Sequence, residues 1–333
     1  MAIDPRQLSR LIFDPSLTFL NKTRTLFEFQ VGNNPVYRRF AKHYISTGKL
    51  PESVGEIPLL PIRAFKECDL ITDGSVQELT FKSSGTGNMN RSRHHVADLE
   101  IYRQSIFREF SRHFNSTDYT LLCYAPGYSD NPDSSLLWML QYLVDQDEQG
   151  LSRFLPLDQP LKQSDLDEAV QHDRQIILFG AAFGLLDLLD LDSHMLPDGS
   201  HIVETGGMKT HRREMSKSEL RKRLSEGFDI TQNHIHSEYG MCELMSQLYA
   251  IGGEWFDTPG WVHASVRDPD DPGRMLDPGV EGKVAIIDLA NIYSCPFILT
   301  EDKGVMNEKG QLAILGRWHS AALRGCNFLI DRD

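Results

Sequence analysis

Four short apolar runs, each leading into a turn, constrain the fold of this chain more than any other feature. They read TLLCYAP, IILFGAAF, HIVETGG and DITQNHIHSEYG, and segments with helical spacing of apolar residues lie between them. Buried strands that alternate with helices form largely parallel sheets. The sequence therefore predicts an α/β fold with mostly parallel sheets flanked by helices.

Changes in pattern along the chain divide it into three predicted parts. Residues 1–60 have amphipathic helical spacing and predict an N-terminal helical cap, and residues 61–255 hold the α/β core. Residues 256–333 combine Pro, Gly and Asp-rich turns with the runs KVAIIDLA, CPFILTE and QLAILGR, and predict a small β-rich subdomain. Within the core, ADLEIYRQSIFREFSRHF predicts a helix, and Ser216 with Glu219 forms a capping box that starts another.

Charge and cysteine content exclude several classes of protein. Lys and Arg total 34 against 47 Asp and Glu, and the net charge of -13 repels nucleic acid and anionic membrane surfaces. The five cysteines form no C-x-x-C pair, which is typical of reduced thiols in the cytosol. No run of about 18 apolar residues occurs, so we expect a cytoplasmic protein without a membrane span.

The segment FKSSGTGNMNRSRHH at residues 81–95 is the first candidate for chemistry. Small residues let backbone N–H groups close around phosphate oxygens, while Arg91 and Arg93 supply positive charge. It matches neither of the two common glycine-rich nucleotide templates. An ordinary flexible Ser/Gly loop is the alternative.

Two later segments also carry reactive side chains. In SEYGMCELMSQ, Tyr239 could stack on a base and Glu243 could bind a divalent metal, the alternative being a packed tyrosine and a solvated glutamate. In LTEDKG we expect Asp302 in an exposed turn, where it could accept both hydroxyls of a ribose, and Arg317 in a later turn could reach phosphate. The alternative for both turns is a purely structural role.

The order of these motifs is more specific than any one of them. The series SSGTG at 83–87, ETGG at 204–207, YGMCE at 239–243, TED at 300–302 and GR at 316–317 resembles that of the adenylate-forming superfamily of acyl and aryl ligases. IPLLPIRAFK, HIVETGGMKTHRREM and SEYGMCELMSQ resemble most the acyl-protein synthetase family of bacterial bioluminescence operons, and phenylacetate-CoA ligases are also similar. The resemblance extends from about Ile57 to Leu329.

This resemblance implies a fold, cofactors and site residues. It implies the N-terminal-type fold of adenylate-forming ligases, with ATP and Mg²⁺ as cofactors and residues 61–255 as the nucleotide- and acyl-binding core. Glu243 would bind magnesium, and Arg317 would contact the nucleotide at a hinge. The implied nucleotide-binding residues are Ser83, Ser84, Gly85, Thr86, Gly87 and Arg91 at the phosphates, Glu204, Gly206 and Gly207 on the adenine and acyl side, Tyr239, Gly240, Met241 and Cys242 at the adenine, and Asp302 at the ribose, with His211, Arg212 and Arg213 as helpers.

Three departures from the superfamily pattern stand out. Gly87-Asn88 replaces Thr-Gly and no lysine follows soon after, so Arg91 is the candidate replacement for that lysine. Cys242 stands where the superfamily has threonine. The sequence stops at Asp333, so we expect the small C-terminal domain and its catalytic lysine to be essentially missing, and the reaction to run without that lysine or with a partner.

The implied reaction is ATP-dependent activation of a carboxylic acid, a fatty acid being expected, with release of pyrophosphate. The acyl group would then pass to a cysteine of the enzyme and on to a partner reductase or other acceptor protein. Cys326, beside Arg324, is the candidate catalytic thiol, and a buried structural thiol is the alternative. Two further alternatives are delivery to coenzyme A or a carrier protein, and a catalytically degenerate regulatory subunit. His234 and His236 would share one face of a strand, but no further Cys/His cluster accompanies them to suggest a metal site.

Overall fold

The computed structural model describes residues 5–44, 50–84, 91–115, 117–191, 195–206 and 215–318 of the 333-residue chain. Its helices are α1 (Pro5–Phe13), α2 (Phe19–Asn33), α3 (Pro35–Ala41), α4 (Ala64–Glu67), α5 (Leu99–His113), α6 (Ser135–Asp145), α7 (Gln163–Gln171), α8 (Ala182–Asp190) and α9 (Lys217–Phe228), with short 3-10 helices η1 (Val54–Glu56), η2 (Tyr128–Asp130) and η3 (Gln232–His234). Its strands are β1 (Leu60–Pro61), β2 (Leu79–Lys82), β3 (Arg93–Val96), β4 (Tyr119–Tyr124), β5 (Arg153–Phe154), β6 (Gln175–Ala181), β7 (His201–Thr205), β8 (Ile235–Tyr239), β9 (Leu248–Ala250), β10 (Val262–Arg267), β11 (Gly282–Asp288), β12 (Phe297–Met306) and β13 (Leu312–Arg317). Among the described residues, no helix is both long and apolar enough to cross a bilayer.

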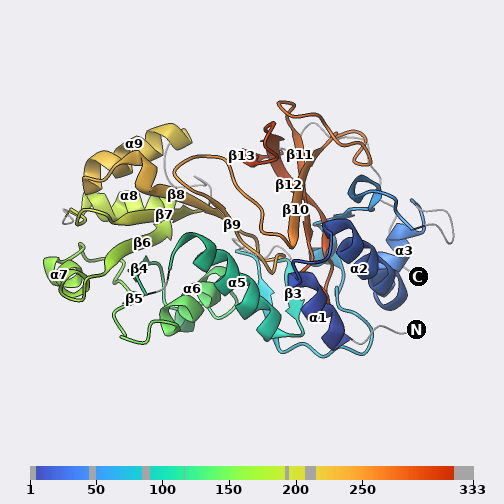
Figure 1. Ribbon diagram of the computed structural model, residues 1–333, viewed down its shortest axis with the longest axis horizontal. Coiled ribbons are helices and arrows are strands. Elements are labelled where there is room, and N and C mark those ends of the chain that lie inside the picture. Colours follow the sequence, from blue (N-terminus) through green and yellow to red (C-terminus); the bar gives the residue numbers. More distant parts are fainter. Residues whose placement is uncertain are drawn as a thin grey trace.

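The larger sheet has the strand order β5-β4-β6-β7-β8-β9. Its strands run parallel from β5 to β8, and only β9 is antiparallel to its neighbour. α5 and α6 lie on one face, and α8 and α9 lie on the other (Figure 1). Because both faces are covered, β6 is apolar along nearly its whole length, whereas β8 carries His236, Ser237 and Glu238 toward its end. The predicted α/β fold with a mostly parallel sheet flanked by helices is confirmed.

Local hydrogen bonds explain where two of the helices begin. Asp98 caps α5 by accepting a bond from the Glu100 backbone N–H at 3.0 Å. Ser216 caps α9 by accepting from the backbone N–H of Glu219 at 3.1 Å. The helix start predicted at Ser216 is therefore confirmed.

A second, smaller sheet holds the strands that follow residue 255. β10, β11 and β12 form an antiparallel meander. On the edge of β12 opposite β11, β1 pairs in parallel with its first residues and β13 pairs in antiparallel orientation with its later ones. The runs predicted as KVAIIDLA, CPFILTE and QLAILGR supply β11, β12 and β13. The division of the chain at residues 60 and 255 stays a prediction, since β1 belongs to this sheet although it lies far earlier in the sequence.

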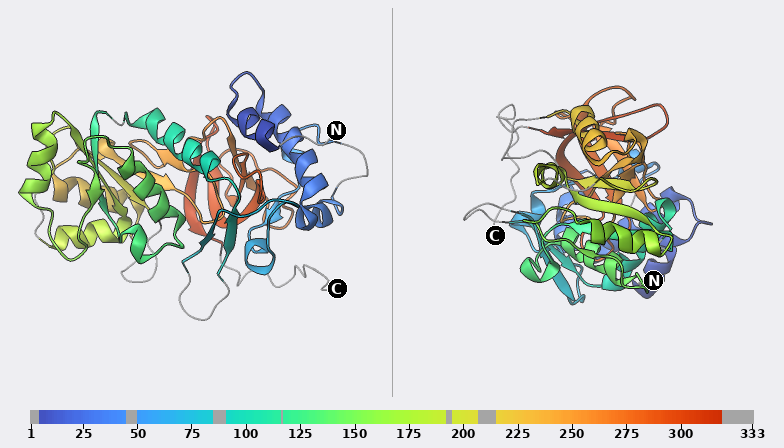
Figure 2. Two further views of the ribbon diagram at one scale, coloured as in Figure 1. Left: turned by 90° about the horizontal axis from the view of Figure 1, so that it is seen from below. Right: turned by 90° about the vertical axis from the view of Figure 1, so that its left-hand side faces the viewer.

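The N-terminal helices pack against the second sheet, at the far end of the molecule from α7 (Figure 2). Phe27 of α2 and Tyr37 of α3 contact the Phe297 ring, with centroids 6.3 and 5.2 Å away. Two buried amides also cross to the segment before β12: Gln30 Nε2 donates to the Ile292 carbonyl at 2.5 Å, and Asn34 Nδ2 donates to the Ser294 carbonyl at 2.8 Å. These bonds fix the helices in register with the sheet.

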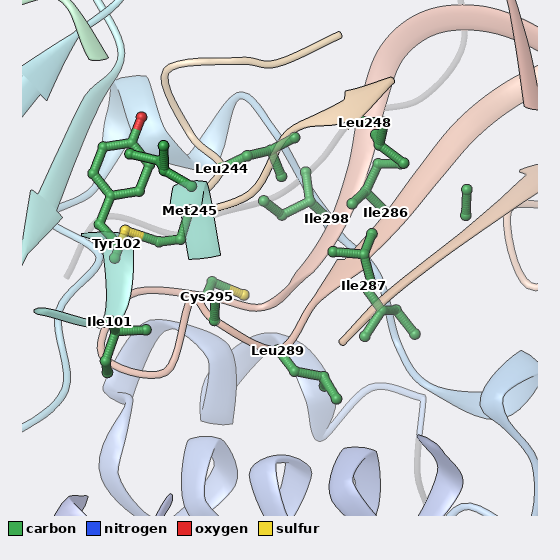
Figure 3. Packing of buried hydrophobic residues seen from close by; sticks show 14 of the residues in the cluster. Ile101, Tyr102, Leu244, Met245, Leu248, Ile286, Ile287, Leu289, Cys295 and Ile298 are labelled. Atoms are coloured by element: carbon green, nitrogen blue, oxygen red, sulfur yellow. The ribbon is translucent and has the colours of Figure 1, made fainter. Parts of the chain in front are cut away.

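One apolar core joins the two sheets. Figure 3 shows Tyr102 of α5 facing Leu244 and Met245, which lie between β8 and β9 and continue toward Ile286 and Ile298 of the second sheet. All of these side chains are at most 4% exposed. The segment that follows β8 is thus packed between the two sheets, and this packing fixes the positions of its polar residues.

Candidate functional site

The candidate site begins at the carboxyl ends of β7 and β8. β7 ends at Thr205 and leads into Gly206, whose φ of +79° few residues other than glycine adopt readily. β8 ends at Tyr239 and leads into the turn Gly240–Glu243. Open α/β sheets bind their ligands at this edge.

Tyr239, Asp302 and Arg317 come together from three strands. The Tyr239 hydroxyl donates to Asp302 Oδ2 at 2.8 Å, and Arg317 Nε lies 3.3 Å from Asp302 Oδ1. Burial, reinforced by the Asp302 carboxylate, raises the pKa of the Tyr239 phenol well above its usual value, so the hydroxyl remains a donor. The Tyr239 ring packs against Phe256, at a centroid distance of 5.9 Å and an interplanar angle of 58°.

The expected place of Asp302 in an exposed turn was wrong. Asp302 lies inside β12 and is 8% exposed, and Arg317 is its cross-strand partner at the end of β13. The reason is that the polar letters TED belong to a strand whose hydrogen bonds continue past them to Met306. The structure nevertheless brings Asp302 together with Tyr239 and Arg317, two residues from other motifs of the series.

Glu243 is buried in the turn after β8, which contradicts its alternative interpretation as a solvated glutamate. Its side chain is 6% exposed, and burial raises its pKa, while the nearby Ser92 hydroxyl and the cations Lys66 and Arg317 act in the opposite direction. Lys66 lies on α4, and nothing in the sequence indicated that this helix reaches Glu243.

Two side chains from other elements hold the Glu243 turn in shape. His94 Nδ1 lies 2.8 Å from the Cys242 carbonyl oxygen, and His94 Nε2 lies 2.9 Å from Asn291 Oδ1. Asn291 Nδ2 in turn donates to the Glu243 carbonyl at 2.8 Å. Sequence reasoning missed the role of both residues. Asn291 stands outside the motifs, and His94, although it lies within the segment 81–95, is distant in the chain from Glu243.

The serine-rich loop lies between β2 and β3, which pair as an antiparallel hairpin. The Ser83 hydroxyl accepts a bond from the Ser92 backbone N–H at 3.0 Å, while Ser84 is exposed. Gly85, Thr86 and Gly87 lie outside the described residues. The Ser83 end of the loop is thereby tied to the start of β3.

Arg91, the proposed replacement for the superfamily lysine, already has partners. Its guanidinium donates to the Ser83 and Lys82 carbonyls and lies 3.2 Å from Asp133 Oδ2. Lys82 Nζ also pairs with Asp133, at 3.1 Å. The role of Arg91 at a phosphate stays a prediction, and it would require Arg91 to share or release this carboxylate.

The two glutamates at the ends of β7 and β8 project to opposite faces of the sheet. Glu204, on the α9 side, accepts a hydrogen bond from the Ser237 hydroxyl. Burial raises the pKa of Glu204, and the positive charge of Lys217 is the strongest influence that lowers it. Glu238, on the α5 side, accepts from the Thr205 hydroxyl, and burial raises its pKa to about 7. Sequence reasoning missed Glu238, although it directly precedes Tyr239.

Several predicted residues lie outside the described part of the chain. They are Gly207, His211, Arg212, Arg213 and Cys326. In the ranges that are described, no group of three or more His, Cys, Asp or Glu side chains is placed to hold a metal ion.

The histidine pair before the motif is also arranged differently from the expectation. His234 belongs to η3, not to a strand, so the expected strand geometry was wrong. The His201 ring stacks between the rings of His234 and His236, with centroid distances of 4.5 and 5.0 Å. His201 Nδ1 lies 2.7 Å from His236 Nε2, so these nitrogens face one another and do not converge on an ion.

Residues 135–333 match the family model described as acyl-protein synthetase, LuxE. The chain belongs to the acyl-protein synthetase family. Family membership identifies it as a ligase. The matched range contains Tyr239, Glu243, Asp302, Arg317 and Cys326.

Two solved structures of 2-hydroxyisobutyryl-CoA ligase share the fold of this acyl-protein synthetase family member. One shows an open conformation in complex with 2-HIB-AMP and CoA; it is 13% identical, with a TM-score of 0.62 over 90% of this chain and 74% of that chain. The other shows the postadenylation state in complex with 2-HIB-AMP; it is also 13% identical, with a TM-score of 0.64 over 90% of this chain and 67% of that chain. The common fold is that of the N-terminal-type domain of adenylate-forming ligases. No curated protein matches the chain.

Proposed function

We propose that this chain activates a carboxylic acid with ATP, forms an acyl-adenylate and then transfers the acyl group to a thiol. A fatty acid is the first candidate substrate, and Cys326 is the first candidate thiol. The observation that carries the proposal is the convergence of Tyr239, Asp302 and Arg317 beside the buried Glu243, at the carboxyl edge of β8.

The nucleotide would bind across this edge. The Tyr239 ring packs against Phe256 and is partly exposed, and its accessible surface is the candidate stacking surface for adenine. Asp302 already has Tyr239 and Arg317 as partners, but an ionised carboxylate has about four acceptor sites and can also accept from ribose hydroxyls. Ser83 and Ser84 are the described residues of the loop proposed for the β and γ phosphates.

Adenylation needs charge stabilisation more than proton transfer. A carboxylate oxygen of the acid attacks the α-phosphorus, a new P–O bond forms, and the bond to the pyrophosphate oxygen breaks. Since the attacking group is already an anion, no general base is required. Arg317 and Lys66, the two cations whose fields reach Glu243, are candidates for holding the converging negative charges together.

The residues around Glu243 fit a magnesium ion held jointly with phosphates. Mg²⁺ in nucleotide sites is commonly bound by one or two carboxylates plus phosphate oxygens, and Glu243 supplies one carboxylate fixed by the His94 and Asn291 contacts to its turn. When bound, the ion would neutralise phosphate charge. The protein's own part is to keep the Glu243 side chain in place.

The second half-reaction transfers the acyl group from the adenylate. A thiolate sulfur attacks the acyl carbon, the bond to the AMP oxygen breaks, and a thioester forms. The thiol would be Cys326, which could then deliver the acyl group to a reductase or another acceptor protein. Coenzyme A or a carrier protein is the alternative acceptor, and a nucleotide-binding regulatory subunit is the alternative without catalysis.

The test is pyrophosphate release from Mg-ATP with a panel of carboxylic acids. We expect release only when a suitable acid is present, and a loss of at least about 100-fold in rate for Glu243→Gln, because a neutral amide is a poor magnesium ligand. Glu308→Gln, at an exposed carboxylate in the turn between β12 and β13, is the matched control and should behave as wild type. Release of phosphate in place of pyrophosphate would contradict adenylation, and binding of ATP without turnover would favour the regulatory alternative.

A further inference from the structure

A second polar cluster lies directly behind the nucleotide motif, on the α5 side of β8. It consists of Glu238, Gln247, Thr205 and Tyr102, all at most 6% exposed. Gly240 joins it to the candidate site: a Cβ placed on Gly240 would lie 2.6 Å from Glu238 Oε1 and 3.8 Å from Gln247 Cγ. Gly240 itself is exposed, so the cluster lies just beneath an accessible surface.

The hydrogen bonds of the carboxylate and amide oxygens in this cluster are incomplete among the described residues. The Thr205 hydroxyl occupies Glu238 Oε2, whereas Oε1 accepts no hydrogen bond from the described residues. Gln247 Nε2 lies 3.5 Å from the Tyr102 hydroxyl, and Gln247 Oε1 is buried without a partner among those same residues. Burying an acceptor without a donor costs about 1–3 kcal/mol, so natural proteins rarely leave such groups unmatched.

An aromatic wall borders the same cluster. The Tyr102 ring stacks on Trp138 at 5.1 Å, and Trp138 stacks on Tyr142 at 5.8 Å. Both Trp138 and Tyr142 are partly exposed. On the α5 side of the site, the aromatic side chains thus lie beside the hydrogen-bond acceptors of Glu238 and Gln247.

We propose that the acid activated by this enzyme carries a hydrogen-bond donor, a hydroxyl or an ammonium group, near its carboxyl end, and that Glu238 and Gln247 select for it. The inference rests on the proposed function, because it assigns the substrate class of the same site. The carboxylate of the acid must reach the α-phosphorus of a nucleotide on Tyr239, so the first carbons of the acid lie beside Gly240. A donor on those carbons would meet Glu238 Oε1 and Gln247 Oε1, while an apolar remainder would lie along the Trp138 wall.

The experiment measures pyrophosphate release with octanoic, 3-hydroxyoctanoic and 3-aminooctanoic acid. The same comparison is repeated with the three corresponding acids of 16 carbons. Wild type should favour a donor-bearing acid by at least tenfold in kcat/KM, because a site built to bind a donor discriminates against an acid without one. Gln247→Leu should reduce this preference severalfold. Gln171→Leu, at an exposed glutamine ending α7, is the matched control.

Glu238→Gln distinguishes the two donor classes. An amide oxygen still accepts from a hydroxyl but gives up the negative charge, so preference for the hydroxy acid should persist, whereas preference for the amino acid should fall. If Gln247→Leu does not fold, as judged by its thermal unfolding, Gln247→Met serves in its place, since its unbranched side chain has a similar volume.

The outcomes separate this inference from the proposed function. Turnover of plain and donor-bearing acids at equal kcat/KM, or a preference unchanged in the Gln247 variant, overturns the donor assignment and leaves adenylation standing. Failure of every acid in the panel to release pyrophosphate overturns both. If wild type binds the hydroxy acid and neither the Gln247 nor the Glu238 variant changes that binding, the donor lies elsewhere in the site and this inference is wrong.

Discussion

Replacing Glu238 by glutamine should make the protein more stable at alkaline pH. Burial raises the pKa of Glu238 from 4.5 to about 7, so the folded state favours the protonated carboxyl. The stabilising contribution of that protonated form is complete below pH 4.5 and is lost as the pH rises through about 7. At about 1.4 kcal/mol per pH unit, ionising this carboxyl costs the folded state about 3 kcal/mol at pH 8.5. Glutamine keeps the neutral form at every pH and can still accept from Thr205.

The measurement is the free energy of unfolding by urea at pH 5 and pH 8.5, for wild type and Glu238→Gln. The two proteins should differ by less than about 1 kcal/mol at pH 5, and the variant should be more stable by about 2–4 kcal/mol at pH 8.5. Asp288, whose pKa burial raises to about 6, titrates in both proteins, so the difference between them isolates Glu238. Glu308→Gln, at an exposed site, should show no such difference. Equal pH dependence in wild type and the Glu238 variant would refute the reasoning.

Two further predictions concern the proposed roles of Asp302 and Cys326. Asp302→Asn should weaken ATP binding, measured by calorimetry, about tenfold or more, because the charge that pairs with Arg317 and would hold the ribose is lost; ATP affinity equal to wild type in the folded variant would make Asp302 structural. Labelled fatty acid with ATP should leave a hydroxylamine-sensitive thioester on wild type that Cys326→Ser abolishes while sparing pyrophosphate release. A thioester that persists in the serine variant would assign the acyl group to another cysteine.

The large sheet was predictable because each of its central strands is apolar on both faces. Ile177 and Ile202 are completely buried, as a parallel strand between two layers of helices requires, and such runs stand out in a sequence. The site residues Tyr239 and Glu243 could be found for a related reason, since they follow one of these runs within five residues.

The remaining site features depend on contacts that no local pattern contains. Asp302 belongs to a strand because β13 pairs with it and with the four residues that follow it, whereas the letters TED alone are typical of a turn. His94 and Lys66 reach the Glu243 turn from elements far earlier in the chain. No local sequence pattern around Glu238 predicts its role. Its environment is set by Thr205 on the neighbouring strand β7 and by Gln247, which directly precedes β9 on the other side of β8.

During synthesis on a ribosome, the N-terminal helices emerge long before the surface that will cover them. Gln30 is separated by 262 residues from Ile292, whose carbonyl it binds, and β1 pairs with no strand until β12 is made. Phe27 and Tyr37 therefore lack the Phe297 ring as a packing partner until most of the chain has been translated. Such long separations slow folding, because chain entropy must be lost before the contacts form. Asp302 lies on that same strand, so a nascent chain completes its apolar core and positions Asp302 at the same late stage.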